Sequence, residues 1–194
     1  MYSNVTLIIS KIVLIIVDLQ SDYFQGGKWE FEGIEAASEK ASALLMCFRG
    51  NRLPIVHVHH EFPTIDAPFF VPNSDGANVH SSVQDRDAES IVIKHQINSF
   101  RDTNLKAVLD NVAVDSLLIC GAMSHMCIDA VTRAANDFGY ECTIAHDACA
   151  TLALEFSGIK VPAHQVHAAF MAALGFAYAR VASTDELLTE INQQ

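Results

Sequence analysis

The stretch LLICGAMSHMCIDAVTR, residues 117–133, predicts a strand, a tight turn and a helix in succession. Four apolar residues precede Gly121, and apolar residues return at helical spacing from Ile128. Cys127 is therefore expected at or just before the first helical turn. There, unpaired N–H groups and the positive end of the helix dipole favour a thiolate, the nucleophilic form of cysteine, and can hold an oxyanion. The alternative is a structural Cys127, because most cysteines are small buried hydrophobic residues.

Length and composition limit the classes of function. The chain has 194 residues, 51% of them hydrophobic, which fits one domain, 1–194, with a substantial core. The formal net charge of −11 leaves no basic surface for nucleic acid, so a small-molecule or protein partner is expected. No apolar run approaches the ~20 residues that span a bilayer, and the N-terminal apolar stretch lacks a charged leader, so no membrane association and a cytoplasmic location are expected. The five cysteines are scattered, with no CxxC pair, which indicates reduced thiols.

Apolar periodicity predicts strands that alternate with helices. A β-branched run at 11–17 ends at Asp18 and is typical of a parallel strand buried on both faces. The other strands are expected at 54–60, 90–94, 115–120, 141–146 and 176–182. Helices are expected at 34–50, 103–111, 127–138 and 162–174, and after Ser183, which forms a capping box with Glu186. The alternation predicts a three-layer α/β fold, with a doubly wound six-stranded parallel sheet and helices on both faces.

Three reactive side chains are expected where predicted strands end. Asp18 follows the first strand, Lys94 ends the third, and Cys127 follows the fourth. In open α/β sheets, ligands bind beyond these carboxyl ends. A half-buried Asp18 needs a partner to stay ionised, which Lys94 can provide. A structural ion pair is the alternative. No GxGxxG follows the first strand, which argues against a dinucleotide-binding domain.

The chain resembles the isochorismatase-like cysteine hydrolases, a family that includes nicotinamidases, N-carbamoyl and ureido amidohydrolases and streptothricin hydrolase. The resemblance rests on three motifs: Val17-Asp18-Leu19-Gln20; Lys94 with Asn98-Ser99-Phe100, Thr103 and Leu105; and GAMSHMCI at 121–128. It covers nearly the whole chain and implies an isochorismatase-like fold with strand order 3-2-1-4-5-6. In that order the third strand lies two spacings from the first, so Lys94 must lean across the second.

The resemblance also implies a site and a reaction. The triad would be Asp18, Lys94 and Cys127, and a cis peptide between Ala122 and Met123 would turn the N–H groups of Met123 and Cys127 toward the substrate as an oxyanion hole. The implied reaction is hydrolysis of a small-molecule carboxamide, ureide or lactam through a thioester, without a cofactor. Asp18 would take the thiol proton and later protonate the leaving amine, while Lys94 holds Asp18 ionised.

Six further side chains are expected to line a substrate pocket: Gln20, Trp29, His60, Phe62, Phe100 and His125. Core packing is the alternative for the aromatic residues among them. Some relatives bind a metal through an Asp and two His near the end of the second strand. This chain has His57, His59 and His60 there without the Asp-x-His pair, so no metal is expected, although zinc would accept His57 and His59.

Two other functions compete with the amidohydrolase. A non-catalytic or redox-responsive binding module would keep the fold, although a sensor needs neither Asp18 nor Lys94. An ether-cleaving isochorismatase is weakened because that chemistry needs no nucleophilic cysteine. The substrate stays open because pocket residues lie in long loops such as 61–90. The apolar content, helices such as 162–174 and the resemblance predict a homodimer or homotetramer.

Overall fold

In the computed structural model, which describes residues 11–193, six parallel strands form a sheet in the order β3-β2-β1-β4-β5-β8. The ends of the predicted domain, residues 1–10 and 194, lie outside the described residues. The strands are Ile12–Val17 (β1), Ile55–His60 (β2), Ser90–Lys94 (β3), Ser116–Ala122 (β4), Glu141–Ala150 (β5) and Arg180–Ala182 (β8). Because β8 is the sixth strand of this sheet, the predicted order 3-2-1-4-5-6 is confirmed.

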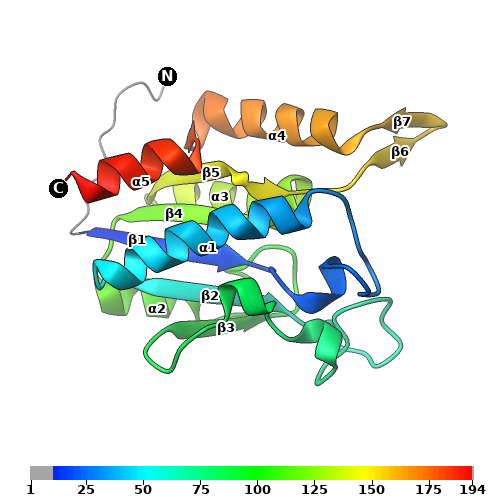
Figure 1. Cartoon of the computed structure of the whole chain (residues 1–194), viewed down its shortest axis with the longest axis horizontal. Helices are drawn as coiled ribbons and strands as arrows, with labels where there is room; N and C mark the ends of the chain where they lie inside the picture. Colours follow the sequence, from blue (N-terminus) through cyan, green and yellow to red (C-terminus); the bar gives the residue numbers. More distant parts are fainter. Residues whose placement is uncertain (1–10, 194) are drawn as a thin grey trace.

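Helices cover both faces of the sheet (Figure 1). They are Ile34–Gly50 (α1), Leu105–Val112 (α2), Asp129–Asp137 (α3), Ala163–Ala177 (α4) and Thr184–Asn192 (α5). In Figure 1, α1 and α5 pack together on one face, while α2 and α3 lie on the other. Every residue of the central strands β1 and β4 is buried, as a sheet between two helical layers requires. In the described part of the chain, no helix is long and apolar enough to cross a bilayer.

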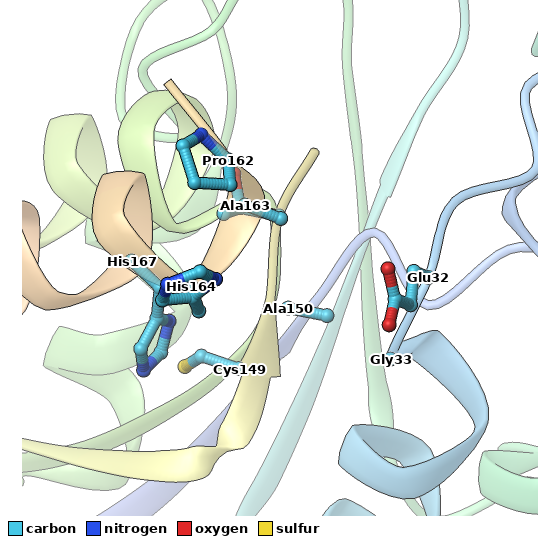
Figure 2. Close-up of a pocket in the computed structure, with 9 residues that line it drawn as sticks. Glu32, Gly33, Cys149, Ala150, Pro162, Ala163, His164 and His167 are labelled. Atoms are coloured by element: carbon cyan, nitrogen blue, oxygen red, sulfur yellow. The ribbon is translucent and has the colours of Figure 1, made fainter. Parts of the chain in front are cut away.

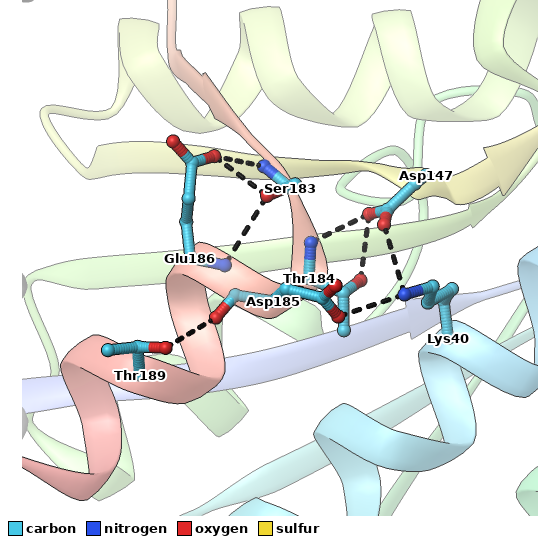
Figure 3. Close-up of polar contacts among 7 residues, drawn as sticks. All are labelled: Lys40, Asp147, Ser183, Thr184, Asp185, Glu186 and Thr189. Carbon is cyan, nitrogen blue, oxygen red and sulfur yellow. Dashed lines mark hydrogen bonds and ion pairs between the residues drawn. The ribbon is translucent and has the colours of Figure 1, made fainter.

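The start of α5 shows how polar side chains join the layers (Figure 3). Ser183 and Glu186 form the predicted capping box, in which each side chain accepts the backbone N–H of the other. Asp147 of β5 accepts hydrogen bonds from the N–H and hydroxyl of Thr184 at 2.7 and 2.8 Å. Lys40 of α1 lies 3.7 Å from the same carboxylate. Since an anion is favourable at a helix N-terminus, Asp147 anchors α5 to the sheet and to α1.

The region around Gly121 differs from the prediction. β4 does not end before Gly121 but continues to Ala122. Gly121 has a φ of 126°, and a Cβ there would lie 2.0 Å from the Val17 carbonyl oxygen. This glycine therefore permits a close approach of β4 to β1. The helix expected at 127–138 is divided into a π-helical turn, Ser124–Ile128, and α3.

Other boundaries shift by a few residues. β5 runs to Ala150 instead of residue 146, and α4 continues through Gly175 to Ala177, which shortens the last strand to three residues. α2 begins at Leu105, whose N–H donates to the Thr103 hydroxyl at 3.2 Å just before the helix.

A short antiparallel hairpin, not predicted from the sequence, follows β5. Its strands are Leu154–Phe156 (β6) and Ile159–Val161 (β7), and in Figure 1 it projects beyond the end of the sheet. Ser157 and Gly158 have φ values of 52° and 79°, as a two-residue hairpin turn requires. Strands of three residues are too short for an alternating pattern to be recognised.

Candidate active site

Asp18, Lys94 and Cys127 meet at the carboxyl edge of the sheet. Lys94 Nζ lies 2.8 Å from Asp18 Oδ2 and 3.2 Å from Cys127 Sγ. Asp18 and Lys94 are fully buried, and Cys127 is 3% exposed. They come from the end of β1, the end of β3 and the π-helical turn after β4. The structure therefore brings together the three reactive residues that the sequence analysis singled out.

The Lys94 side chain crosses the end of β2 to reach Asp18, and His60 provides a hydrogen-bond acceptor for its ammonium there. His60 ends β2 and is the register partner of Lys94 on β3. Lys94 Nζ donates a hydrogen bond to His60 Nδ1 at 2.9 Å, so the ammonium lies across the end of β2. Asp18 has a φ of 53°, in the left-handed region that Asp tolerates better than most residues, and its N–H bonds to the Val58 carbonyl at 2.9 Å. The chain thus turns at Asp18 while its backbone stays attached to β2.

Burial, together with the Asp18 carboxylate, keeps the Cys127 thiol protonated in the resting site. Burial opposes the charge of Lys94, but the Asp18 carboxylate and the Cys127 sulfur outweigh it and raise the pKa of Lys94. Burial and then the Asp18 carboxylate raise the pKa of Cys127 far above its ordinary value, against the opposing effect of Lys94. This corrects the expectation of a thiol pKa lowered by a helix N-terminus, because burial dominates at this position.

Asp18 has the geometry of a proton acceptor. Lys94 Nζ lies 2.8 Å from Oδ2, and the Cys127 thiol is within hydrogen-bonding reach of the same carboxylate. Lone pairs on a buried carboxylate are therefore available next to the Cys127 thiol. A proton that leaves the sulfur can pass directly to Asp18.

His60 presents an N–H group with no partner. Burial, and then the positive charge of Lys94, lower the pKa of His60 to about 4, so the ring is neutral at neutral pH. An ammonium group has only donors, so Nδ1 accepts from Lys94 and the ring proton is on Nε2. Nε2 is buried and makes no hydrogen bond with the described residues. His60 can therefore donate to a bound molecule.

The turn that carries Cys127 begins with a cis peptide between Ala122 and Met123, where the resemblance implies one. The Met123 carbonyl accepts the N–H groups of Met126 at 3.0 Å and Ile128 at 3.3 Å. The Met123 N–H makes no hydrogen bond within residues 11–193. It is therefore available to a developing oxyanion.

Side chains outside the motifs fasten this turn. The buried Ser124 hydroxyl lies 3.3 Å from the Ala150 carbonyl and 2.8 Å from His167 Nδ1. His125 Nδ1 lies 2.6 Å from the Thr151 hydroxyl. Ser124 lies within the third motif, but Thr151 and His167 were not predicted, because no spacing along the chain links them to that motif. His125, expected to contact substrate, is half-buried and bound to the end of β5.

A row of aromatic rings leads from the triad to the surface. Ring centroids are 4.5 Å apart for His60 and Phe62, 5.1 Å for Phe62 and Phe69, and 4.9 Å for Phe69 and Trp29. Trp29 is 40% exposed. Three of the residues predicted to line the pocket, His60, Phe62 and Trp29, therefore belong to one row of rings, and their contact with a substrate stays a prediction. Phe69 and Tyr23, which contact each other at 5.7 Å, were missed.

Two residues predicted to line the pocket make contacts elsewhere in the fold. Gln20 donates to the His60 carbonyl at 2.8 Å and to a second carbonyl at 2.7 Å, and accepts the His60 N–H at 2.7 Å. The buried amide of Gln20 thus makes its hydrogen bonds with backbone groups, including both those of His60. Phe100 packs against Phe138 at 5.0 Å, beyond the last turn of α3. Because the nine residues of α3 span about 14 Å, Phe100 contacts the end of that helix remote from the nucleophile turn.

The histidines of β2 are engaged with other groups or separated. His57 Nε2 lies 2.8 Å from Glu89, which also pairs with Arg49 at 2.6 Å. The ring centroids of His57 and His59 are 6.3 Å apart. Within residues 11–193, no three His, Cys, Asp or Glu side chains are grouped so that they could hold a metal ion. Activity without a metal stays a prediction.

Comparisons with known proteins give one consistent family. The isochorismatase domain pattern matches residues 12–185. The chain is 43% identical over 175 residues to the uncharacterized isochorismatase family protein YddQ of Bacillus subtilis, covering 90% of this chain and 97% of YddQ. It is 35% identical over 136 residues to the secreted isochorismatase effector Isc1 of Verticillium dahliae, covering 70% of each.

Two further proteins bear on activity and fold. The chain is 31% identical over 140 residues to streptothricin hydrolase of Streptomyces noursei, covering 71% of this chain and 49% of that one. It is 61% identical to a candidate isochorismatase hydrolase from Oleispira antarctica, whose crystal structure superposes with a TM-score of 0.90 over 93% of this chain and 97% of that chain.

Proposed function

The chain belongs to the isochorismatase family of hydrolases, and from this premise we propose that it hydrolyses a C–N bond in a small-molecule carboxamide, ureide or lactam, with Cys127 as nucleophile. One observation carries the proposal: the buried ammonium of Lys94 contacts both the Asp18 carboxylate and the Cys127 sulfur. A structural ion pair needs only the first contact. A thiol held between a carboxylate and an ammonium is the arrangement that nucleophilic catalysis requires. The similarity to streptothricin hydrolase points to the same reaction class.

The reaction begins with proton transfer. Because the raised pKa of Cys127 keeps the thiol protonated, the proton moves to Asp18 as the sulfur attacks the substrate carbonyl. A C–S bond forms, and the carbonyl oxygen becomes an oxyanion held by the N–H groups of Met123 and Cys127. Lys94 keeps its positive charge throughout and offsets the negative charge that passes between sulfur and Asp18.

The second half releases both products. The C–N bond breaks as Asp18 returns the proton to the leaving nitrogen, which leaves a thioester on Cys127. Water then attacks the thioester and gives a proton to Asp18. The C–S bond breaks, and the sulfur takes that proton back, which restores the thiol and the carboxylate.

The surroundings favour a flat, uncharged substrate. The aromatic row through Phe62, Phe69 and Trp29 offers apolar contact area, and His60 Nε2 offers one N–H to an acceptor such as a second carbonyl. The similarity to Isc1 favours isochorismate as a second candidate. That molecule carries two carboxylates, however, and the ammonium of Lys94 already contacts Asp18, His60 and Cys127. Isochorismate would therefore place its negative charges beside the Asp18 carboxylate, while the ammonium of Lys94 is already paired with other groups.

A substrate panel separates the candidates. Amides, ureides, lactams and isochorismate are incubated with the wild type, Cys127→Ala and Cys47→Ala, and ammonia, amine and pyruvate are measured. We expect C–N cleavage by the wild type and by Cys47→Ala, none by Cys127→Ala, and an acyl adduct on Cys127 in quenched samples by mass spectrometry. Isochorismate turnover that survives Cys127→Ala would replace the amidohydrolase with the ether-cleaving reaction, and no turnover of any compound would favour a binding module.

We also propose a homo-oligomer, a dimer or tetramer, joined through α4. Residues 163–179 contain no Asp, Glu, Lys or Arg, although the chain has a net charge of −11. Phe176 of α4 is 83% exposed and Phe156 of the hairpin is 81% exposed. An uncharged apolar surface is where two equally charged copies can meet without repulsion. Light scattering should show more than a 21.2 kDa monomer, and Ala172→Glu on α4 should weaken assembly while the exposed control Ala36→Glu does not.

A cytoplasmic location is part of the proposal. All five cysteines are free thiols, the state that reducing compartments maintain. Fractionation of cells that express the untagged protein should recover it with cytoplasmic markers. Recovery from the medium would contradict this placement.

A further inference from the structure

We infer that a cavity of about 300 Å³ beside the nucleophile turn is a second binding pocket, which takes the ammonium group of a small molecule. The cavity lies between the loop before α1 and the start of α4, over the end of β5 (Figure 2). Its walls include Glu32, Cys149, Thr151, His164 and His167, but no triad residue. The volume is at the lower end of that typical for small-molecule sites. This inference goes beyond the proposed hydrolase activity and does not depend on it.

The charge of the pocket points to a cation. Glu32 is the only Asp, Glu, Lys or Arg among the lining residues, and its carboxylate makes no hydrogen bond or ion pair with the described residues. In Figure 2, Glu32 faces His164 and His167 across Cys149 and Ala150 of β5. Cys149 and His167 add no charge at neutral pH: burial raises the pKa of Cys149 to about 12, and burial together with His146 lowers that of His167. An uncompensated carboxylate in a chain of net charge −11 favours a positively charged ligand.

The apolar part of the lining suggests the rest of the ligand. Ala150, Pro162 and Ala163 give the cavity its apolar lining, and in Figure 2 Ala150 lies between Glu32 and the histidines while Pro162 and Ala163 lie above His164. A primary ammonium can donate to Glu32 while its carbon chain packs on these three residues. The ligand class is therefore a primary amine with a short apolar stem.

The pocket shares walls with the supports of the nucleophile turn. Thr151 contacts His125 at 2.6 Å, and His167 contacts Ser124 at 2.8 Å. Ser124 and His125 belong to the π-helical turn that contains Cys127. A ligand that presses on Thr151 or His167 thus acts on residues that hold this turn. We expect an amine in the pocket to change the rate at which iodoacetamide alkylates Cys127.

Binding of n-pentylamine, with 1-pentanol as its uncharged counterpart, tests the inference. Titrations followed by calorimetry compare the wild type with Glu32→Gln and Glu39→Gln. Glu39 is an exposed carboxylate of α1 that does not line the cavity, so both variants lose the same charge. We expect pentylamine to bind the wild type and Glu39→Gln with equal affinity, and to bind Glu32→Gln about five-fold more weakly. Pentanol should bind the wild type no more tightly than pentylamine binds Glu32→Gln.

Three results would overturn the inference: no pentylamine binding to the wild type, equal binding by the wild type and Glu32→Gln, or equal weakening by Glu32→Gln and Glu39→Gln. A two-fold or larger change in Cys127 alkylation with pentylamine, lost in Glu32→Gln, would support it further. Both glutamates are exposed, so the variants are expected to fold, which near-UV circular dichroism checks. No substrate is used, so failure here is distinguishable from failure of the proposed hydrolase activity.

Discussion

Replacing Lys94 with methionine should destabilise the fold by removing the one ammonium among residues 11–193 that contacts Asp18. Methionine has a similar length but no charge. Asp18 is fully buried, and Lys94 Nζ lies 2.8 Å from its Oδ2 oxygen. Breaking a buried ion pair by removing one partner costs about 3–5 kcal/mol. Against a total stability of about 5–15 kcal/mol, such a loss is readily measured.

The assay is urea unfolding followed by far-UV circular dichroism at one protein concentration, because assembly would make stability concentration-dependent. Lys94→Met should lower the free energy of unfolding by about 3–5 kcal/mol. Adding Asp18→Asn should recover most of that loss, because no charge then stays buried alone. Lys40→Met, which removes a partly exposed lysine 2.9 Å from Asp185, should barely move the urea midpoint. A Lys94→Met variant within about 1 kcal/mol of wild type, or a double variant no more stable than the single, would refute the reasoning.

Four further outcomes are expected. Cys127→Ala and Cys127→Ser should lose turnover with unchanged circular dichroism, and retained turnover would remove Cys127 from the mechanism. Asp18→Asn should be inactive, yet iodoacetamide should alkylate its Cys127 at least ten-fold faster than in the wild type. The reason is that burial and the Asp18 carboxylate both raise the pKa of the thiol, and without the carboxylate only burial opposes the effect of Lys94. Slower alkylation would contradict this. The pKa of His60 is about 4 in the folded chain and about 6.5 in the unfolded chain. Between these pH values the unfolded chain binds one more proton than the folded chain. The free energy of unfolding should therefore fall by about 3 kcal/mol as the pH drops from 6.5 to 4. His60→Gln should flatten this loss in urea titrations, and an equally steep loss would argue against a neutral His60. Exhaustive chelation should leave activity intact, and a loss restored by zinc, manganese or iron would make His57, His59 and His60 metal ligands.

The framework of the fold is predictable because it depends on local pattern. The apolar run of β1 and the periodic apolar residues of α1 identify both elements, and the predicted bounds 34–50 and 90–94 match α1 and β3. The π-helical turn and the continuation of β4 are not predictable in this way. Gly121 near the end of β4 lies against Val17, a contact between residues about a hundred positions apart that no local pattern reveals.

The triad residues could be located for a topological reason. Carboxyl ends of parallel strands share one edge, so residues that end different strands lie near one another. A motif gives positions along the chain but not the direction of a side chain. Gln20 follows Asp18 closely yet faces the backbone of His60, and Phe100 turns toward Phe138. Thr151 and His167 carry no sequence signal at all, because their role depends on packing against the nucleophile turn.

The neutral state of His60 explains how a lysine on β3 serves an acid on β1. A protonated imidazole would repel the ammonium, whereas the lowered pKa of His60 leaves Nδ1 as an acceptor for Lys94. Gln20, just beyond β1, binds both the N–H and the carbonyl of His60 and fixes the ring at the end of β2. Lys94 is then guided over β2 until its ammonium meets Asp18. Three adjacent strands therefore contribute one residue each to a chain of contacts, from His60 to Lys94 and from Lys94 to Asp18. Protonation of His60 would remove the acceptor of Lys94, so the position of Lys94 would change before the charge of Asp18 does.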